Sequence, residues 1–167
     1  MLLEELENGS FVDKRDPGEL TTGEKRVSVA PEESRFLAWV ARARNVLEIG
    51  TGLGVSTRAL HKHCRSLTTI DIDPYVHDHV WPKLPLEVWK VKDRAKVPLE
   101  KFDVVFVDGD HRTEQVRRDA EFAIARCQGV VIFHDAFMPS VQEGLAGFAD
   151  WQVLDTTWGL AICWVWR

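Results

Sequence analysis

The fold of this chain is decided by residues 45–56, which read Asn45-Val46-Leu47-Glu48-Ile49-Gly50-Thr51-Gly52-Leu53-Gly54-Val55-Ser56. The apolar residues Val46, Leu47 and Ile49 predict a short buried strand. The three glycines that follow can adopt positive φ or let a ligand approach the backbone closely, because they carry no Cβ. We therefore expect a strand, a glycine-rich turn and a helix from about residue 55, an order typical of a cofactor-binding loop.

The glycine spacing separates this loop from the dinucleotide fingerprint. That fingerprint needs G-x-G-x-x-G, so that a pyrophosphate can lie on the N-terminus of the helix. Here the spacing is G-x-G-x-G, Val55 stands at the third glycine position, and Glu48 would place a carboxylate near the pyrophosphate. A carboxylate suits a cation better on Coulombic grounds. S-adenosylmethionine, which carries a sulfonium and an ammonium group and no phosphate, therefore fits this loop.

A second acid supports an adenosine ligand. Residues 67–71 read as a strand that ends at Asp71, about twenty residues after Gly50. At this separation a βαβ unit returns a carboxylate to the ribose hydroxyls of an adenosine cofactor. Methyltransferases and dehydrogenases share the feature, so Asp71 does not choose between them.

Polar residues also follow two later strands. A strand that begins at Phe102 ends in Asp108-Gly109-Asp110-His111, and a strand over 129–135 ends in His134-Asp135. In open α/β sheets, ligands bind in the crevice outside the carboxyl ends of the strands. We therefore expect these groups to converge on one pocket with the glycine loop.

The remaining pattern predicts an α/β fold: a doubly wound, seven-stranded, mostly parallel sheet with an antiparallel last strand. Residues 1–30 read as a polar N-terminal extension, and residues 31–167 as a single domain. Besides the elements above, we expect helices at 31–44, 55–63, 75–81, 113–126 and 139–148, and strands at 86–91, 151–154 and 160–166.

The ordered set of motifs resembles class I S-adenosylmethionine-dependent methyltransferases. Asp-Gly-Asp-His followed by His-Asp, with a Pro-Glu-Glu helix before the Glu48 loop, is similar to small metal-dependent O-methyltransferases, the group with sugar and macrolide methyltransferases and cephalosporin-hydroxylase-like proteins. The resemblance implies that the cofactor is S-adenosylmethionine and that it is bound by Glu48, Gly50, Thr51, Gly52, Gly54, Ser56, Asp71, Asp93 and Asp108. In this family a residue at the place of Asp93 bonds the adenine amino group.

The same resemblance implies a metal and a base. Asp108, His134 and Asp135 would hold the metal, and His111, together with Asp108, would act in catalysis, with His111 taking the proton of the acceptor hydroxyl. Magnesium suits such oxygen ligands and leaves positions for two neighbouring substrate oxygens. His134 stands where related proteins often have a Glu, which would favour a softer ion such as manganese. From the residues alone, Asp108 could instead cap a turn and His134 could be a hydrogen-bonded core histidine.

Charge and composition limit the kinds of binding partner and the location that we expect. The formal net charge of −5 argues against nucleic acid as the main partner. No apolar run is long enough to span a membrane, and the acidic N-terminus does not resemble a secretory signal, so we expect a cytoplasmic protein. The expected partner is a small-molecule methyl acceptor, and the Trp-rich final strand could support a homodimer. An NAD-dependent oxidoreductase and a non-catalytic binding protein with a methyltransferase fold are the alternatives.

Overall fold

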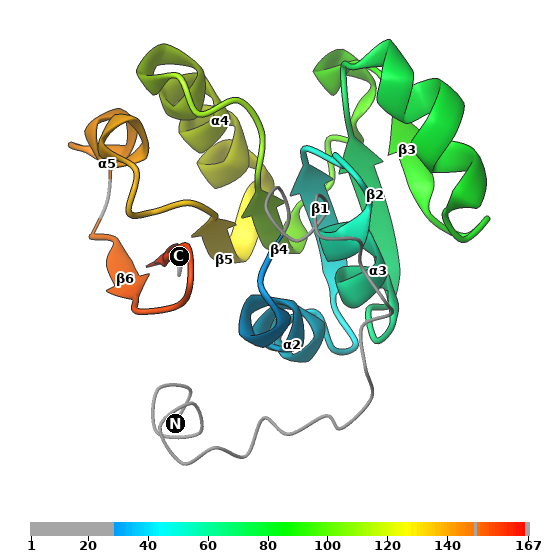
Figure 1. The fold of residues 1–167 in the computed structure, drawn as a ribbon, viewed down its shortest axis with the longest axis horizontal. Coiled ribbons are helices and arrows are strands. Elements are labelled where there is room, and N and C mark those ends of the chain that lie inside the picture. Colours follow the sequence, from blue (N-terminus) through cyan, green and yellow to red (C-terminus); the bar gives the residue numbers. More distant parts are fainter. Residues whose placement is uncertain (1–28, 149, 166–167) are drawn as a thin grey trace.

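The computed structural model describes residues 29–148 and 150–165. The expected N-terminal extension lies outside the described residues except for its last two positions. The expected sheet is confirmed: within the described ranges it has seven strands in the order β3-β2-β1-β4-β5-β7-β6 (Figure 1). The strands are β1 Asn45–Ile49, β2 Ser66–Ile70, β3 Trp89–Val91, β4 Phe102–Val107, β5 Cys127–Phe133, β6 Gln152–Leu154 and β7 Leu160–Trp164.

Among the strands that the structure describes, only β7 runs against its neighbours. β1 pairs in parallel with β2 and β4, β2 with β3, and β4 with β5. β7 is antiparallel to both β5 and β6. The carboxyl ends of β1, β2, β4 and β5 therefore open on the same edge of the sheet, where ligands bind in folds of this class.

Helices cover both faces of the sheet. Apolar residues of α2 (Pro31–Val40) and α3 (Val55–His61) pack with one face. Those of α4 (Thr113–Arg126) and α5 (Pro139–Leu145) pack with the other (Figure 1). The two cores thus give the doubly wound arrangement that the sequence predicts. None of these described helices has the length and apolar composition to cross a bilayer.

One expected helix has a different form. Residues 75–81 form a π-helical turn, η2 (Val76–Val80), which runs into a 3-10 turn, η3 (Trp81–Lys83). Pro82 and Pro85 cannot donate the backbone hydrogen bonds of an α-helix. The Val88 N–H donates to the Pro85 carbonyl (3.3 Å), so the following strand begins only at Trp89.

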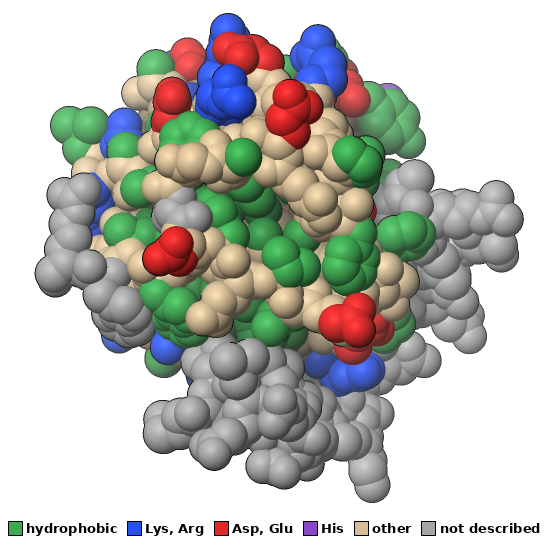
Figure 2. Space-filling view, turned by 90° about the vertical axis from the view of Figure 1, so that its left-hand side faces the viewer, with side chains coloured by type: hydrophobic (Ala, Val, Ile, Leu, Met, Phe, Trp, Pro, Cys, Tyr) green, Lys and Arg blue, Asp and Glu red, His purple; other side chains and the backbone are tan. Residues whose placement is uncertain are grey.

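The side of the molecule formed around α5 and β6 exposes hydrophobic side chains. Figure 2 shows this face, with hydrophobic groups across its middle and charged groups mostly around them. A cavity of about 410 Å³ lies here, between α5 and the β6–β7 pair, and Leu145, Trp151 and Val153 contribute to its lining. The edge strand β6 borders it.

Gly50 permits the close approach of β1 and β4 at the ligand-binding edge. The Asp108 N–H donates to the Ile49 carbonyl (2.8 Å), and the Gly50 N–H donates to the Ile70 carbonyl (2.8 Å). Gly50 has φ +95°, and a Cβ built there would lie 2.0 Å from the Asp108 carbonyl oxygen. Gly52 also has positive φ (+49°), but a Cβ there would meet no described atom within 4 Å. The first glycine is thus needed for strand packing, whereas the second leaves space beside the loop.

These two glycines make a matched pair for a stability test. Alanine at either position should cost about 1–2 kcal/mol for the left-handed backbone. Gly50→Ala should cost about 1–3 kcal/mol more, because its methyl group overlaps backbone that cannot move without separating β1 from β4. Denaturant unfolding of both variants measures the difference. Equal losses would contradict the packing role of Gly50.

Candidate active site

Two cavities that share lining residues follow the glycine loop at the carboxyl ends of β1, β2 and β4. The smaller, about 220 Å³, is lined by residues of the loop together with Asp108 and His111. The larger, about 660 Å³, extends past Asp71 toward Arg94 and α4. Both are lined by Gly50, Gly52, Asp108 and Gly109. The loop and the end of β4 therefore contribute to the walls of both cavities.

Glu48 lies beneath this loop. Its side chain is fully buried and accepts hydrogen bonds from Ser56 Oγ (2.6 Å), Thr57 Oγ1 (2.7 Å) and Thr69 Oγ1 (2.6 Å). Burial raises the pKa of the Glu48 carboxyl to about 7, although the three hydroxyls favour its charged form. The sequence predicts that this carboxylate faces a cation, whereas the structure places it where it joins β1, β2 and α3. Thr57 and Thr69 are parts of the site that sequence reasoning missed.

Thr51 and Asp71 hold the outer part of the loop. Asp71 Oδ2 accepts the N–H groups of Thr51 (2.9 Å) and Gly52 (3.0 Å), and Asp71 lines the larger cavity. The buried Thr51 hydroxyl lies 2.8 Å from Thr69 Oγ1 and accepts the Trp81 Nε1 hydrogen at 3.2 Å. A ribose-binding role for Asp71 stays a prediction, and its present contacts put the carboxylate at the cavity wall. Gly54, the third glycine, caps α3 in the left-handed conformation with φ +76°.

Asp93 makes a local contact. It caps the short 3-10 turn η4 (Arg94–Lys96) by accepting the Ala95 N–H at 2.9 Å. Its neighbour Arg94, rather than Asp93, lines the larger cavity, where it is paired with the buried Asp119. An adenine contact from Asp93 stays a prediction.

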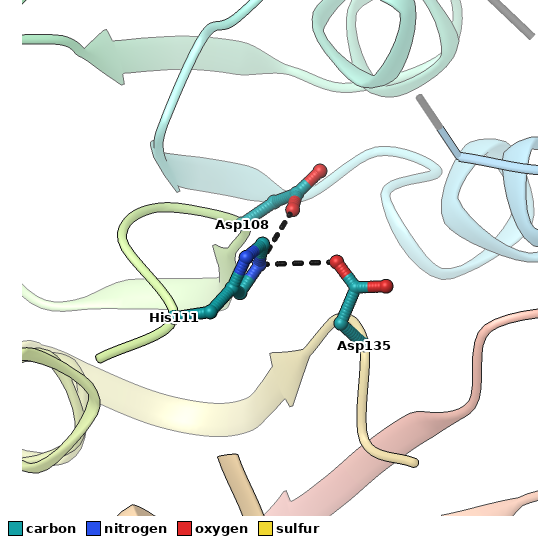
Figure 3. Close-up of side chains that lie close together, drawn as sticks. All are labelled: Asp108, His111 and Asp135. Atoms are coloured by element: carbon teal, nitrogen blue, oxygen red, sulfur yellow. Dashed lines mark ion pairs between the residues drawn. The ribbon is translucent and has the colours of Figure 1, made fainter. Parts of the chain in front are cut away.

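Asp108, His111 and Asp135 converge at the ends of β4 and β5 (Figure 3). His111 Nε2 lies 3.0 Å from Asp135 Oδ2 and 3.7 Å from Asp108 Oδ1. Among the described residues this buried nitrogen has no aligned hydrogen-bond acceptor, in spite of the short distance. The two carboxylates raise the pKa of His111 to about 9. Asp110, the remaining acid of this turn, accepts the Arg112 N–H at 2.9 Å and thus caps the turn.

His134 lies behind this group and is almost fully buried. Its Nδ1 lies 3.1 Å from Asp135 Oδ2 and 3.3 Å from Asp108 Oδ1, and its Nε2 lies 2.9 Å from Glu33 Oε2. The three carboxylates raise the pKa of His134 to about 12, against the effect of burial. The two histidines in turn hold the pKa of Asp135 well below its usual range, and that of Asp108 below it also. Glu33, on α2, is a member of the site that the sequence did not suggest.

The side chains fit a divalent cation by their donor chemistry. One donor atom from each of Asp108, His111 and Asp135 lies within 4.8 Å of the others, and His111 Nε2 has no aligned acceptor. Carboxylate and imidazole groups together suit first-row metal ions such as manganese. The sequence predicts Asp108, His134 and Asp135 as ligands. The structure brings these three side chains together with His111, and His134 Nδ1 faces the same two carboxylates as His111 does.

The sheet order, the glycine loop after β1 and the acids after β2 and β4 define the class I methyltransferase fold. Residues 47–136, more than half of the chain, match the methyltransferase domain family. The chain therefore belongs to the methyltransferase domain family. This confirms the resemblance to class I S-adenosylmethionine-dependent methyltransferases and the enzyme class predicted from the sequence.

Solved structures support the fold. An O-methyltransferase of tomaymycin synthesis from Streptomyces achromogenes, TomG, in complex with SAM, has a TM-score of 0.73 at 18% identity and covers 99% of this chain and 96% of its own. A Klebsiella pneumoniae protein provisionally assigned as an O-methyltransferase gives 0.72 at 20% identity, with 99% and 90% covered. A Bacillus cereus O-methyltransferase in complex with SAH gives 0.70 at 19%, with 98% and 88% covered. No curated protein matches the chain.

The charge of the site gives a pH prediction for the metal-free protein. We expect His111 to titrate near pH 9, above its ordinary pKa of about 6.5. Because the folded-state pKa is raised, the stabilisation from the charged ring is complete below about pH 6.5 and is lost as the pH rises through about 9. An NMR titration of the ring Cε1–H measures this pKa.

Two variants check the cause of the His111 shift. Asp135→Asn should lower the pKa of His111, because it removes a negative charge 3.0 Å from Nε2. Glu114→Gln, which neutralises an exposed acid paired with Arg118 on α4, should leave the titration in place. A wild-type His111 that titrates near pH 6.5 would contradict the proposed geometry.

Proposed function

We propose that this protein transfers the methyl group of S-adenosylmethionine to a hydroxyl oxygen of a small molecule. One observation carries the proposal: Asp108 lines both cavities beside the glycine loop and also belongs to the Asp108–His111–Asp135 group. A cofactor seated along the loop would thus end beside groups that can take a proton. The O-methyltransferases of similar fold support oxygen as the accepting atom.

The glycine loop fits the cofactor by its open space. A Cβ at Gly52 would enter the cavity without meeting a described atom within 4 Å, so the bare backbone leaves room for a ligand. Asp71 stands at the wall of the larger cavity, where it could exchange its backbone partners for ribose hydroxyls. Asp108 would place negative charge near the sulfonium. Bound SAM and SAH in two of the similar structures support this choice of cofactor.

S-adenosylmethionine would supply an electrophilic methyl group, whose bond to sulfur breaks as the bond to the acceptor oxygen forms. His111 would take the hydroxyl proton at Nε2, and Asp135, 3.0 Å away, would stabilise the resulting imidazolium. The glycine loop and the end of β4 would hold both reactants in line, which removes much of the entropic barrier.

Asp108 and Asp135, with His134 or His111, would hold a divalent ion, magnesium or manganese. The ion would neutralise the two carboxylates and so lower the pKa of His111 and of a hydroxyl next to it. This matters because the raised pKa of His111 keeps the ring protonated at neutral pH, and a protonated ring cannot act as a base. A cytoplasmic location, a homodimer and the lack of a nucleic-acid partner stay predictions from the sequence.

Calorimetric titration tests the cofactor. We expect saturable binding of S-adenosylmethionine and none of NAD, the control ligand for the oxidoreductase alternative. Gly52→Val should abolish binding, because it fills the cavity with a branched side chain. Gly147→Val offers a control: this glycine also has positive φ (+87°) and open space, but it lines the cavity beside α5. Wild-type affinity in Gly52→Val would mean that the cofactor lies elsewhere.

His111→Ala tests the base. With a catechol or sugar acceptor that the wild type methylates, turnover should fall by about 10²–10⁴-fold while S-adenosylmethionine affinity stays nearly unchanged. Manganese affinity should also persist if His111 is the base and His134 the ligand. Loss of manganese binding would instead make His111 a ligand, and an equal loss of cofactor binding would remove the base assignment. A protein that binds S-adenosylmethionine but methylates no acceptor would favour the non-catalytic alternative.

A further inference from the structure

We propose that Glu33 is a positioning residue of this site: its buried carboxylate fixes the His134 ring so that Nδ1 faces Asp108 and Asp135. This inference rests on the proposed function, because it assigns to α2 a part in ordering the two aspartates. It adds a residue 101 positions away from His134 in sequence.

Glu33 is built into the protein as a fixed acceptor. Its side chain has no exposed surface. Oε2 accepts from the Ala30 N–H (2.7 Å) and lies 2.9 Å from His134 Nε2, and Oε1 accepts from Thr156 Oγ1 (2.7 Å) and the Trp158 N–H (3.0 Å). A buried charge is tolerated only with such partners. These contacts join the start of α2, the end of β5 and the β6–β7 turn, so the carboxylate cannot rotate without losing several of them.

The His134 ring transmits this constraint. Its two nitrogens are at opposite sides of the ring, so an Nε2–H held by Glu33 sets the direction of Nδ1. That direction places Nδ1 3.1 Å from Asp135 and 3.3 Å from Asp108. The edge of the ring also packs against Phe106, with centroids 6.3 Å apart. At metal sites, a histidine ring is usually held in place because the ring nitrogen that faces away from the site donates to a carboxylate. Here that nitrogen is Nε2, and the carboxylate is Glu33.

Glu32 makes a second link between α2 and the β6–β7 turn, separate from that of Glu33. It lies beside Glu33 in the first turn of α2 and accepts the Thr157 N–H at 3.1 Å and the Thr157 hydroxyl. It therefore also joins α2 to the β6–β7 turn, but no contact of Glu32 reaches His134 among the described residues. Glu32→Gln is thus a matched control for the brace, and Thr156→Val, which removes one donor to Glu33, is a second.

Glutamine cannot replace Glu33 fully. Four donors point at the carboxylate, whereas an amide has one acceptor oxygen and adds two N–H donors of its own. In Glu33→Gln the ring of His134 should therefore lose its fixed partner even if the chain folds.

The primary test is the histidine ring spectrum of the full chain by ¹⁵N–¹H NMR at one pH, without metal. In the wild type, the His134 Nε2–H should be downfield and protected from exchange. Glu33→Gln should remove this signal and shift both ring nitrogens, whereas Glu32→Gln and Thr156→Val should keep it. A rapidly exchanging Nε2–H in the wild type would overturn the proposal even if Glu33→Gln fails to fold, and so would the same loss in Glu32→Gln.

Manganese titration then tests the consequence for the aspartates. We expect Glu33→Gln to weaken manganese binding by about 10–100-fold, with S-adenosylmethionine affinity unchanged. In a His134→Gln background, Glu33→Gln should add almost nothing, since it acts through the ring. Additive losses, or wild-type manganese affinity in Glu33→Gln, would overturn the positioning role. The ring spectrum needs neither metal nor acceptor. A failure of methyl transfer would therefore reject the proposed function and leave the test of Glu33 by the ring spectrum unaffected.

Discussion

The buried carboxylate of Glu48 is the interaction on which the ligand-binding edge depends. Three hydroxyls, two from the first turn of α3 and one from β2, converge on it. An unpaired charge in this position would be costly, so the strand, the loop and the helix are fixed relative to one another. The loop therefore has its open shape before a ligand arrives, and a cofactor need not supply the free energy of ordering it.

The candidate site is built from alternating charges. Glu33, His134, the pair Asp108 and Asp135, and then His111 follow one another from the interior toward the smaller cavity. Each carboxylate favours the charged form of its neighbouring histidine, and each histidine favours the ionised acid. This arrangement lets five ionisable groups share a largely buried region, and two of them, Asp108 and His111, also line the smaller cavity.

The sequence predicts the sheet and the place of the site, because both follow from local signals. Apolar runs mark the strands, and parallel strands bring Asp71, Asp108 and Asp135 to one edge. The direction of the Glu48 side chain could not be predicted, because β1 is buried on both faces of the sheet. Alternation of side chains along the strand therefore does not tell which face lies toward the ligand. In the sequence, Glu33 is only one acid of the Pro-Glu-Glu helix start, because nothing local indicates a partner 101 residues away. Pro82 and Pro85 predict where the helical turn that begins at about residue 75 ends, but no local signal in the sequence predicts its π-helical hydrogen bonding.

Asp135, whose carboxylate faces both histidines of the site, has an unusual backbone conformation. It is not a glycine, yet its φ is +55°, in the left-handed region. A glycine there would relieve the strain but would remove the carboxylate that faces both histidines. The left-handed backbone at Asp135 thus lowers the stability of the fold, but it directs the carboxylate toward the two histidines. Selection for chemistry and selection for thermal robustness should act in opposite directions at this position, so searches for stabilising substitutions will tend to find variants here that have lost the site.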